Sequence, residues 1–405
     1  MIGILVSLAL ASAFYLSPYP LQLVLQMPLF NLLLIPVGVV TLFITALVHV
    51  LFLYPLQRME KLSSRIMDLY CKNSKQRLVA LGMLLYSLIT LVMAGVGLSE
   101  DAAAFRIAVA IWICLTGVYI DLLRTFFKSS LRFLNPMSLT SMFTAEAKKC
   151  VRRDHDLDLC QWIDALTELA LHSLARAQVQ LSANAIDQVA IIEQHFLNCL
   201  KSLGHTAVTS HEGRKEEVAE EINYVLFYMF QRLELINEKA VEYACESLTT
   251  RIATILGKMA IAGAKFDLSL TAFPLHFLGK CVQKAQEKGF VDTPFQATCT
   301  LVEVAKTLAT EVNITYMDIQ TPFLSIIAQL EKIAKRTFKA DKSMGLMILR
   351  QPFLAIQAML KTEKFAAHQD TPVIMRDLDR VLSEFDALEM VMKSIPSIPP
   401  ELKQE

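Results

Sequence analysis

The long apolar runs of this chain of 405 residues all lie within residues 1–123. Leu29–Tyr54 contains no ionisable acidic or basic side chain except His49, and Leu78–Leu98 contains none. Both runs exceed the roughly 18 apolar residues that mark a membrane span. Lipid offers the backbone no hydrogen-bond partners, so such runs cross it as helices. The sequence therefore predicts a membrane-anchored protein whose remaining residues fold outside the bilayer.

Two further segments complete the predicted transmembrane region. Phe105–Leu123 is apolar apart from Arg106 and Asp121, whose side chains can reach the two interfaces. Met1–Ser17 lacks the basic start and the small-residue cleavage site of a signal peptide, so we interpret it as a retained span, with a re-entrant segment as the alternative. The transmembrane region is expected at residues 1–123, with four spans at about 2–17, 29–54, 78–98 and 105–123.

The loops between the spans predict their orientation. Pro55–Arg77 carries six Lys and Arg against two acidic residues, whereas Ser99–Ala104 carries two acidic residues and no cation. Lys and Arg are enriched in cytoplasmic loops. We therefore expect a multi-pass protein of the plasma membrane, the inner membrane in a bacterial cell. Four spans place both termini in the cytoplasm, and three would leave the N-terminus outside.

Charge divides the rest of the chain into two parts. Residues 124–153 form a basic juxtamembrane connector with seven Lys and Arg against one Glu, a formal charge of 7 − 1 = +6. Residues 154–405 carry 25 Lys and Arg against 33 Asp and Glu, a formal charge of 25 − 33 = −8. A basic connector attracts anionic headgroups of membrane lipid. An acidic distal domain argues against nucleic-acid binding.

The distal part is predicted to be a soluble domain made only of helices. Asp164–Gln178 and Ala185–Leu200 place apolar residues three and four positions apart, as amphipathic helices do, and Glu216–Thr250 continues the pattern. Pro294, Pro322 and Pro372 each follow a Thr and mark helix starts; Pro274 and Pro352 occupy comparable places. Pro352 is also open to interpretation as a kink in a helix that begins near Ser343.

The spacing of these helix starts indicates repeated helical hairpins. Pro274 and Pro322 are 48 residues apart, and Pro322 and Pro372 are 50 apart. These spacings are close to the roughly 40–47 residues of a HEAT repeat. The predicted fold is therefore all-α, with an array of helical hairpins, either a HEAT-like solenoid or a compact helical bundle, at residues 154–405.

This order of elements resembles an uncharacterised family of bacterial predicted integral membrane proteins. Those proteins have N-terminal spans, a basic stretch and a helical soluble region, in which a helix of the type L-x-x-x-A-L-R-A-L-S-P is followed by N-D-P-x-T-A. Leu166–Ala175 is similar to the first motif, whereas Ser182–Asp187 lacks the N-D-P core of the second. The resemblance implies the architecture and no biochemical activity.

Residues with candidate chemistry are few. The eight cysteines form no C-x-x-C pair, so we expect reduced thiols and no zinc site. Asp154–Asp158 offers metal-ligand side chains, but such acidic runs more often form a solvated turn, and His172 and His195 are most simply structural. No nucleophile elbow, phosphate-binding loop or zinc motif occurs. We therefore assign no catalytic, cofactor or metal residue, and an enzyme is the less favoured class.

Two functions remain open at this point. The first is a platform that presents a helical cytoplasmic domain to an unknown protein partner. The second is a small transporter or channel in which His49 lies in the pathway, because an ionisable side chain in a span usually faces the bundle interior or a cavity. Ala94, Gly95 and Gly97 allow close helix approach, within one chain or in a homo-oligomer.

Overall fold

The computed structural model describes residues 2–16, 27–96, 102–151, 156–207, 213–311, 318–340 and 346–394. Every regular element in these residues is a helix, which confirms the all-α prediction. The chain forms two compact units, Met1–Leu139 and Thr140–Glu405. Their boundary falls inside residues 124–153, the segment that we expected to be a separate connector. The first part of that segment continues the helix of the last predicted span, and the boundary lies within the next helix, at residues 136–151.

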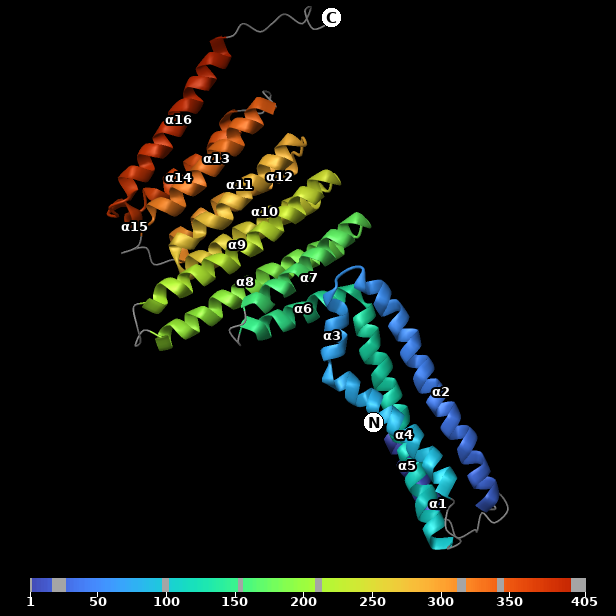
Figure 1. Ribbon diagram of the computed structural model, residues 1–405. Helices are drawn as coiled ribbons and strands as arrows, with labels where there is room; N and C mark the ends of the chain where they lie inside the picture. Colours follow the sequence, from blue (N-terminus) through green and yellow to red (C-terminus); the bar gives the residue numbers. More distant parts are fainter. Residues whose placement is uncertain are drawn as a thin grey trace, which may run out of the picture. The chain divides into compact units, whose positions relative to one another are not determined.

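The helices that lie wholly within the described residues of the first unit (Figure 1) are α1 (Ile2–Leu16), α2 (Met27–Glu60), α3 (Arg65–Lys72), α4 (Ser74–Val96) and α5 (Ala102–Leu134). Helix α4 packs on both α2 and α5, and α1 packs on α5. The buried core between α2, α4 and α5 includes Phe52, Met83 and Phe126. Most other large side chains of these helices are exposed, as expected of surfaces that face lipid.

Within the described residues, three helices of this unit are long and apolar enough to cross a membrane: Leu34–Glu60, Ser74–Ala94 and Ile107–Leu134. The prediction of four spans is therefore corrected. The first predicted span is helix α1, an apolar helix of 15 residues. Such a helix is about 22 Å long, whereas the hydrocarbon core is about 30 Å thick.

The second unit is a succession of helices. Residues 136–151 form α6 (Pro136–Val151), which begins just before the unit boundary. The others are α7 (Asp156–Ala175), α8 (Val179–Ala207), α9 (Gly213–Glu242), α10 (Glu246–Phe266), η1 (Leu268–Thr271), α11 (Ala272–Glu287), α12 (Asp292–Glu311), α13 (Gln320–Ala340), α14 (Leu346–Leu360), α15 (Glu363–Ala366) and α16 (Thr371–Ser394).

These helices pack in two rows (Figure 1). One row contains α7, α9, α11, α13 and α16, and each helix packs on the next in the row. The other contains α8, α10, α12 and α14, which pack in the same way. Contacts between α7 and α8, α9 and α10, α11 and α12, and α13 and α14 join the rows. A helix therefore contacts the next helix in the sequence and the one after that.

Three of the turns that join the rows share one backbone geometry. Ala177, Ala244 and Gly289 have φ values of 58°, 53° and 86°. In each turn the next residue donates its N–H to the carbonyl five residues back, at 2.9, 2.8 and 3.0 Å. This is the Schellman ending of a helix, in which a left-handed residue allows the chain to reverse. The turn at Ala244 divides the predicted helical segment Glu216–Thr250 between α9 and α10. Of the three turn residues only Gly289 is the glycine that signals such a turn in a sequence.

The prolines fall as predicted at most helix starts. Pro274, Pro294, Pro322 and Pro372 lie in the first turns of α11, α12, α13 and α16. Pro352 instead lies inside α14 and does not mark a helix start, whereas Ser343, the start expected in the alternative interpretation, lies outside the described residues. At α13 the side chain that caps the helix is Asp318, which accepts hydrogen bonds from the backbone N–H groups of Gln320 and Thr321 at 2.8 and 3.4 Å.

Candidate functional site

Basic side chains gather at one end of the first unit. They lie at the end of α2 and in the turn that follows it, on α3, on the start of α4 and on the end of α5. Contacts between these segments show that they meet: Gln76 donates a hydrogen bond to Ser130 at 2.8 Å, and the rings of Tyr70 and Phe133 are 5.4 Å apart. We call this group the basic collar; it consists of Arg58, Lys61, Arg65, Lys72, Lys75, Arg77, Arg124, Lys128 and Arg132.

Most of the collar is uncompensated by acidic side chains. Arg65 pairs with Asp68 at 3.0 Å, and Arg58 donates to the hydroxyl of Tyr54 at 2.8 Å. The other seven are exposed and form no side-chain hydrogen bond or ion pair within the described part of the chain. Each such cation near an anionic bilayer is worth about 1 kcal/mol of attraction. The collar is therefore suited to the headgroup level of an anionic membrane.

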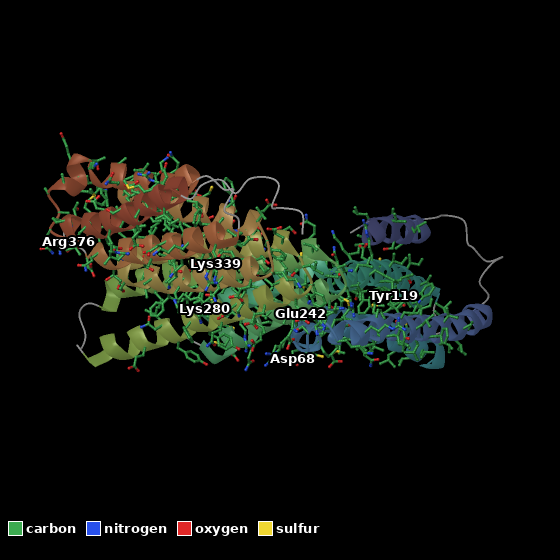
Figure 2. The ribbon with its side chains drawn as sticks, turned by 90° about the horizontal axis from the view of Figure 1, so that it is seen from above. Asp68, Tyr119, Glu242, Lys280, Lys339 and Arg376 are labelled. Atoms are coloured by element: carbon green, nitrogen blue, oxygen red, sulfur yellow. The ribbon has the colours of Figure 1, made fainter. Side chains whose placement is uncertain are left out.

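A polar network lies inside the apolar part of the same unit. The Tyr119 hydroxyl, which lies among the helices of this unit (Figure 2), contacts the Thr45 hydroxyl at 3.1 Å and donates to the carbonyl of Thr41 at 3.2 Å. The Tyr86 hydroxyl contacts that of Thr116 at 2.8 Å, and the two tyrosine rings stack with centroids 4.7 Å apart. The sequence analysis missed this network, although two tyrosines in the middle of predicted spans could have indicated it.

The His49 side chain contacts none of the hydroxyls of this network within the described residues and bonds only to a backbone carbonyl. Its Nδ1 lies 2.7 Å from the carbonyl oxygen of Thr45, one turn earlier in the same helix, and its ring packs against Phe126 at 4.6 Å. A histidine whose polar atom is satisfied by its own helix has a structural explanation. The geometry thus gives no direct support to a pathway through His49.

The other candidate residues are not brought together. Asp154 and His155 lie outside the described residues. His172 is exposed on α7, and His195 lies 3.6 Å from Cys199 on α8. Among the described residues no three His, Cys, Asp or Glu side chains form a group that could hold a metal ion. Ala94 packs against the small core around Leu34 and Val109, within the first unit.

The second unit carries a ladder of ion pairs along the row α7–α9–α11–α13–α16. Each step of the row has at least one pair: Arg232 with Asp164 at 2.7 Å, Lys284 with Glu234 at 3.5 Å, Arg336 with Glu287 at 3.4 Å, and Arg380 with Glu331 at 2.9 Å. Because acids and bases alternate, this edge of the stack neutralises itself. We therefore interpret the ladder as a structural feature that aligns neighbouring helices.

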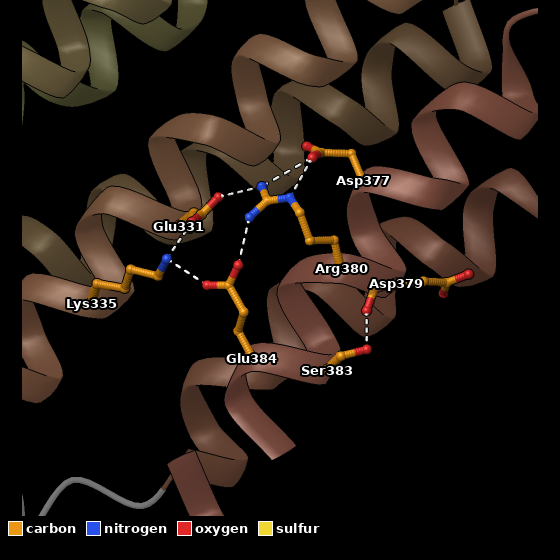
Figure 3. A network of polar contacts seen from close by, with 7 residues as sticks. All are labelled: Glu331, Lys335, Asp377, Asp379, Arg380, Ser383 and Glu384. Atoms are coloured by element: carbon orange, nitrogen blue, oxygen red, sulfur yellow. Dashed lines mark hydrogen bonds and ion pairs between the residues drawn. The ribbon is translucent and has the colours of Figure 1, made fainter. Parts of the chain in front are cut away.

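The last step of the ladder is the most developed (Figure 3). Arg380 contacts Glu331, Asp377 and Glu384 at 2.7–2.9 Å, and Lys335 bridges Glu331 and Glu384. Burial by itself raises the pKa of Glu331, but hydrogen bonds from Arg380 and Lys335 have the larger combined effect, so this pKa is lowered. Hydrogen bonding by Lys335 also lowers the pKa of Glu384.

The ladder predicts a specific loss on removing Arg380. Arg380→Gln should destabilise the second unit by about 1 kcal/mol, the upper range for exposed ion pairs, because one cation serves three carboxylates. Arg376→Gln is the matched control: Arg376 is exposed on the same helix and forms no ion pair within the described residues (Figure 2). Thermal unfolding at low and at about 1 M salt measures the difference, which should shrink as salt screens the pairs. Equal effects of the two substitutions would contradict the ladder.

No family model, curated protein or solved structure matches the chain. The resemblance to the bacterial membrane-protein family stays a prediction from sequence, and a function has to be argued from the geometry of the two units.

Proposed function

We propose that the protein is anchored in the membrane by its first unit and that its second unit is a cytoplasmic platform for protein interaction. The observation that carries the proposal is the surface of α2, α4 and α5. Large apolar side chains cover it, for example Phe43 with 65% of its surface exposed and Leu78 with 69%. Exposure of such a large apolar surface to water is unfavourable, whereas lipid tails cover it. The basic collar lies at one end of the same unit.

The two rows of the second unit support the solenoid form of the predicted fold over a compact bundle. Side-chain contacts between neighbouring hairpins join residues with similar separations. Asn237 donates to the carbonyl of Cys281, 44 residues on, and Gln286 donates to that of Ile333, 47 residues on. Repeated separations with repeated turns are typical of stacked hairpins in which each repeat contacts its neighbours.

An exposed aromatic surface on α9 and α11 is the favoured contact area for a partner. Tyr224, Phe227 and Phe273 expose 55%, 44% and 44% of their surfaces. Phe227 packs edge-on against the buried Phe277 with ring centroids 5.6 Å apart, which holds it in place. Aromatic side chains held in this way are enriched at protein interfaces.

A photo-crosslinking amino acid at Tyr224 tests the platform in cells that contain the full chain. A discrete protein adduct is expected at Tyr224 and not at Val373, an exposed apolar residue on α16. Phe227→Ser should remove the adduct without lowering the amount of protein in the membrane. Adducts of equal yield at both positions would contradict a specific contact area.

The orientation can be tested by cysteine labelling. In a chain with Cys71 replaced by serine, Ser64→Cys lies on the collar and is exposed. We expect a membrane-impermeant thiol reagent to modify it only after the membrane is permeabilised, because the surrounding loop is basic. Labelling of intact cells or spheroplasts to the same extent would reverse the proposed topology.

The alternative function, a small transporter or channel, depends on the polar side chains inside the first unit. The Nδ1 atom of His49 already has a hydrogen-bond partner in its own helix, the carbonyl of Thr45. We therefore expect His49→Leu to change stability little, by no more than about 0.6 kcal/mol, the average for hydrogen bonds between membrane helices. Solute flux into liposomes that contain the full chain, lost in His49→Leu or Tyr119→Phe while membrane insertion is kept, would favour the conduit over the platform.

A further inference from the structure

A groove runs along the junction of α1 and α5 in the first unit. It has a volume of about 390 Å³ and its exposed lining is almost entirely apolar. Val6 and Leu10 of α1 and Ile113 and Ile120 of α5 form much of the wall, and Arg124 lies at one end. We call it the α1–α5 groove.

The groove exists because two helices approach closely beside it. Gly117 has no side chain, and a Cβ there would lie 1.9 Å from the Ser7 hydroxyl and 2.5 Å from the carbonyl oxygen of Gly3. Asp121 accepts hydrogen bonds from the backbone N–H groups of Gly3 and Ile4 at 3.1 and 3.2 Å. Its carboxylate is thereby directed at the start of α1, and Arg124 is left exposed with no acidic partner among the described residues.

The cations at one end of the groove and the length of its apolar wall match the headgroup and one acyl chain of a lipid molecule. On α5, Arg124 is 11 residues from Ile113, a distance of about 16 Å along a helix. One leaflet of the hydrocarbon core is about 15 Å deep, half of the ~30 Å bilayer core. Lys128, one turn beyond Arg124 and also exposed, adds a second cation at the charged end.

We propose that the α1–α5 groove binds an anionic phospholipid. The phosphate lies at Arg124 and Lys128, and one acyl chain lies along the apolar wall toward Trp112. Zwitterionic lipid fits the same wall but gains less at the two cations. The inference rests on the proposed membrane anchoring and adds to it a defined lipid class and a defined place.

Trp112 lines the groove and provides the measurement. The chain has only one other tryptophan, Trp162, which is buried in the second unit. In Trp162→Phe protein of full length, Trp112 fluorescence is followed in phosphatidylcholine vesicles that contain increasing fractions of lipid brominated on its acyl chains. Bromine quenches tryptophan on contact, so brominated phosphatidylglycerol and brominated phosphatidylcholine report their relative association at the groove.

Brominated phosphatidylglycerol is expected to associate about fivefold or more strongly than brominated phosphatidylcholine, the ratio that one uncompensated cation near the headgroups provides. Arg124→Gln should lower this ratio about fivefold, whereas Lys61→Gln, which removes a collar cation that does not line the groove, should leave it unchanged. Ile120→Phe, which narrows the wall, should weaken quenching by both lipids.

Equal quenching by both lipids, or an equal loss in Arg124→Gln and Lys61→Gln, would overturn the lipid site. Flotation of the same vesicles separates this result from failure of the proposed function. Protein that floats with the vesicles but shows no preference overturns the site alone. Protein that does not float overturns both the membrane anchor and the site.

Discussion

Gly257→Leu should destabilise the second unit by about 3 kcal/mol, at the upper end for an overpacked core. Gly257 of α10 faces α12, and a Cβ there would lie 2.1 Å from Cγ2 of Thr300. The Thr300 hydroxyl donates a hydrogen bond to the carbonyl of Gln296 at 2.9 Å, which fixes the rotamer of this β-branched side chain. The helices must therefore separate. We expect the melting temperature to fall by roughly 6–12 °C.

Substitutions in the turns between rows are matched controls, because they change glycine or alanine without a clash. A Cβ on Gly289 meets no atom within 4 Å, so Gly289→Ala should cost only about 1 kcal/mol for its positive φ. Ala244→Gly should instead stabilise the second unit by about 1 kcal/mol, because glycine adopts the positive φ of this position without the steric strain of a Cβ atom. A Gly257→Leu variant with the same melting temperature as the Gly289→Ala variant would contradict close packing of α10 against α12.

Glu193→Gln should make the second unit more stable than the native chain at pH 8, and the gain should disappear near pH 4. Glu193 lies on α8 with 2% of its surface exposed, and no described residue pairs with its side chain. Burial raises its pKa well above the ordinary value of a glutamate. The native state therefore holds the proton to a higher pH than the unfolded chain does. Stability falls as the pH rises from about 4.3, the unfolded value, to the native pKa.

The measurement is thermal or urea unfolding of both proteins between pH 4 and pH 8. Within the window between the two pKa values the difference should grow by about 1.4 kcal/mol per pH unit. Burial of the uncharged glutamine amide adds an offset that does not depend on pH, so the slope is unchanged. Glu303→Gln, on the exposed face of α12, should show no such slope. A stability difference between Glu193→Gln and the native chain that does not change with pH would contradict this prediction, because it would show that ionisation of Glu193 costs the folded state no stability.

The ladder responds to pH in the opposite direction. Since the pKa values of Glu331 and Glu384 are lowered in the folded protein, their contribution is present above about pH 4.3 and is lost as the pH falls through the folded values. Comparing each variant with the native chain at the same pH separates this effect from that of Glu193.

Local patterns in the sequence determined much of this architecture. Hydrophobic runs such as Leu78–Leu98 and the three- and four-residue spacing of apolar positions depend only on neighbouring residues, so they predicted helices and apolar segments of membrane length. The prolines at 294, 322 and 372 marked helix starts for the same reason. The basic collar was partly visible as a loop with an excess of cations.

What depends on distant residues was decided only by the tertiary structure. The turn at Ala244 lacks the glycine that signals a left-handed residue, so packing of α10 against α8 and α12 has to impose it. The network of Tyr86 and Tyr119 and the groove beside Gly117 each require side chains from separate helices to meet. Glu193 resembles any helical glutamate in sequence, and its raised pKa arises from neighbours that surround it only in the folded stack. Composition and periodicity are properties of one segment, whereas burial and contact are properties of several segments together.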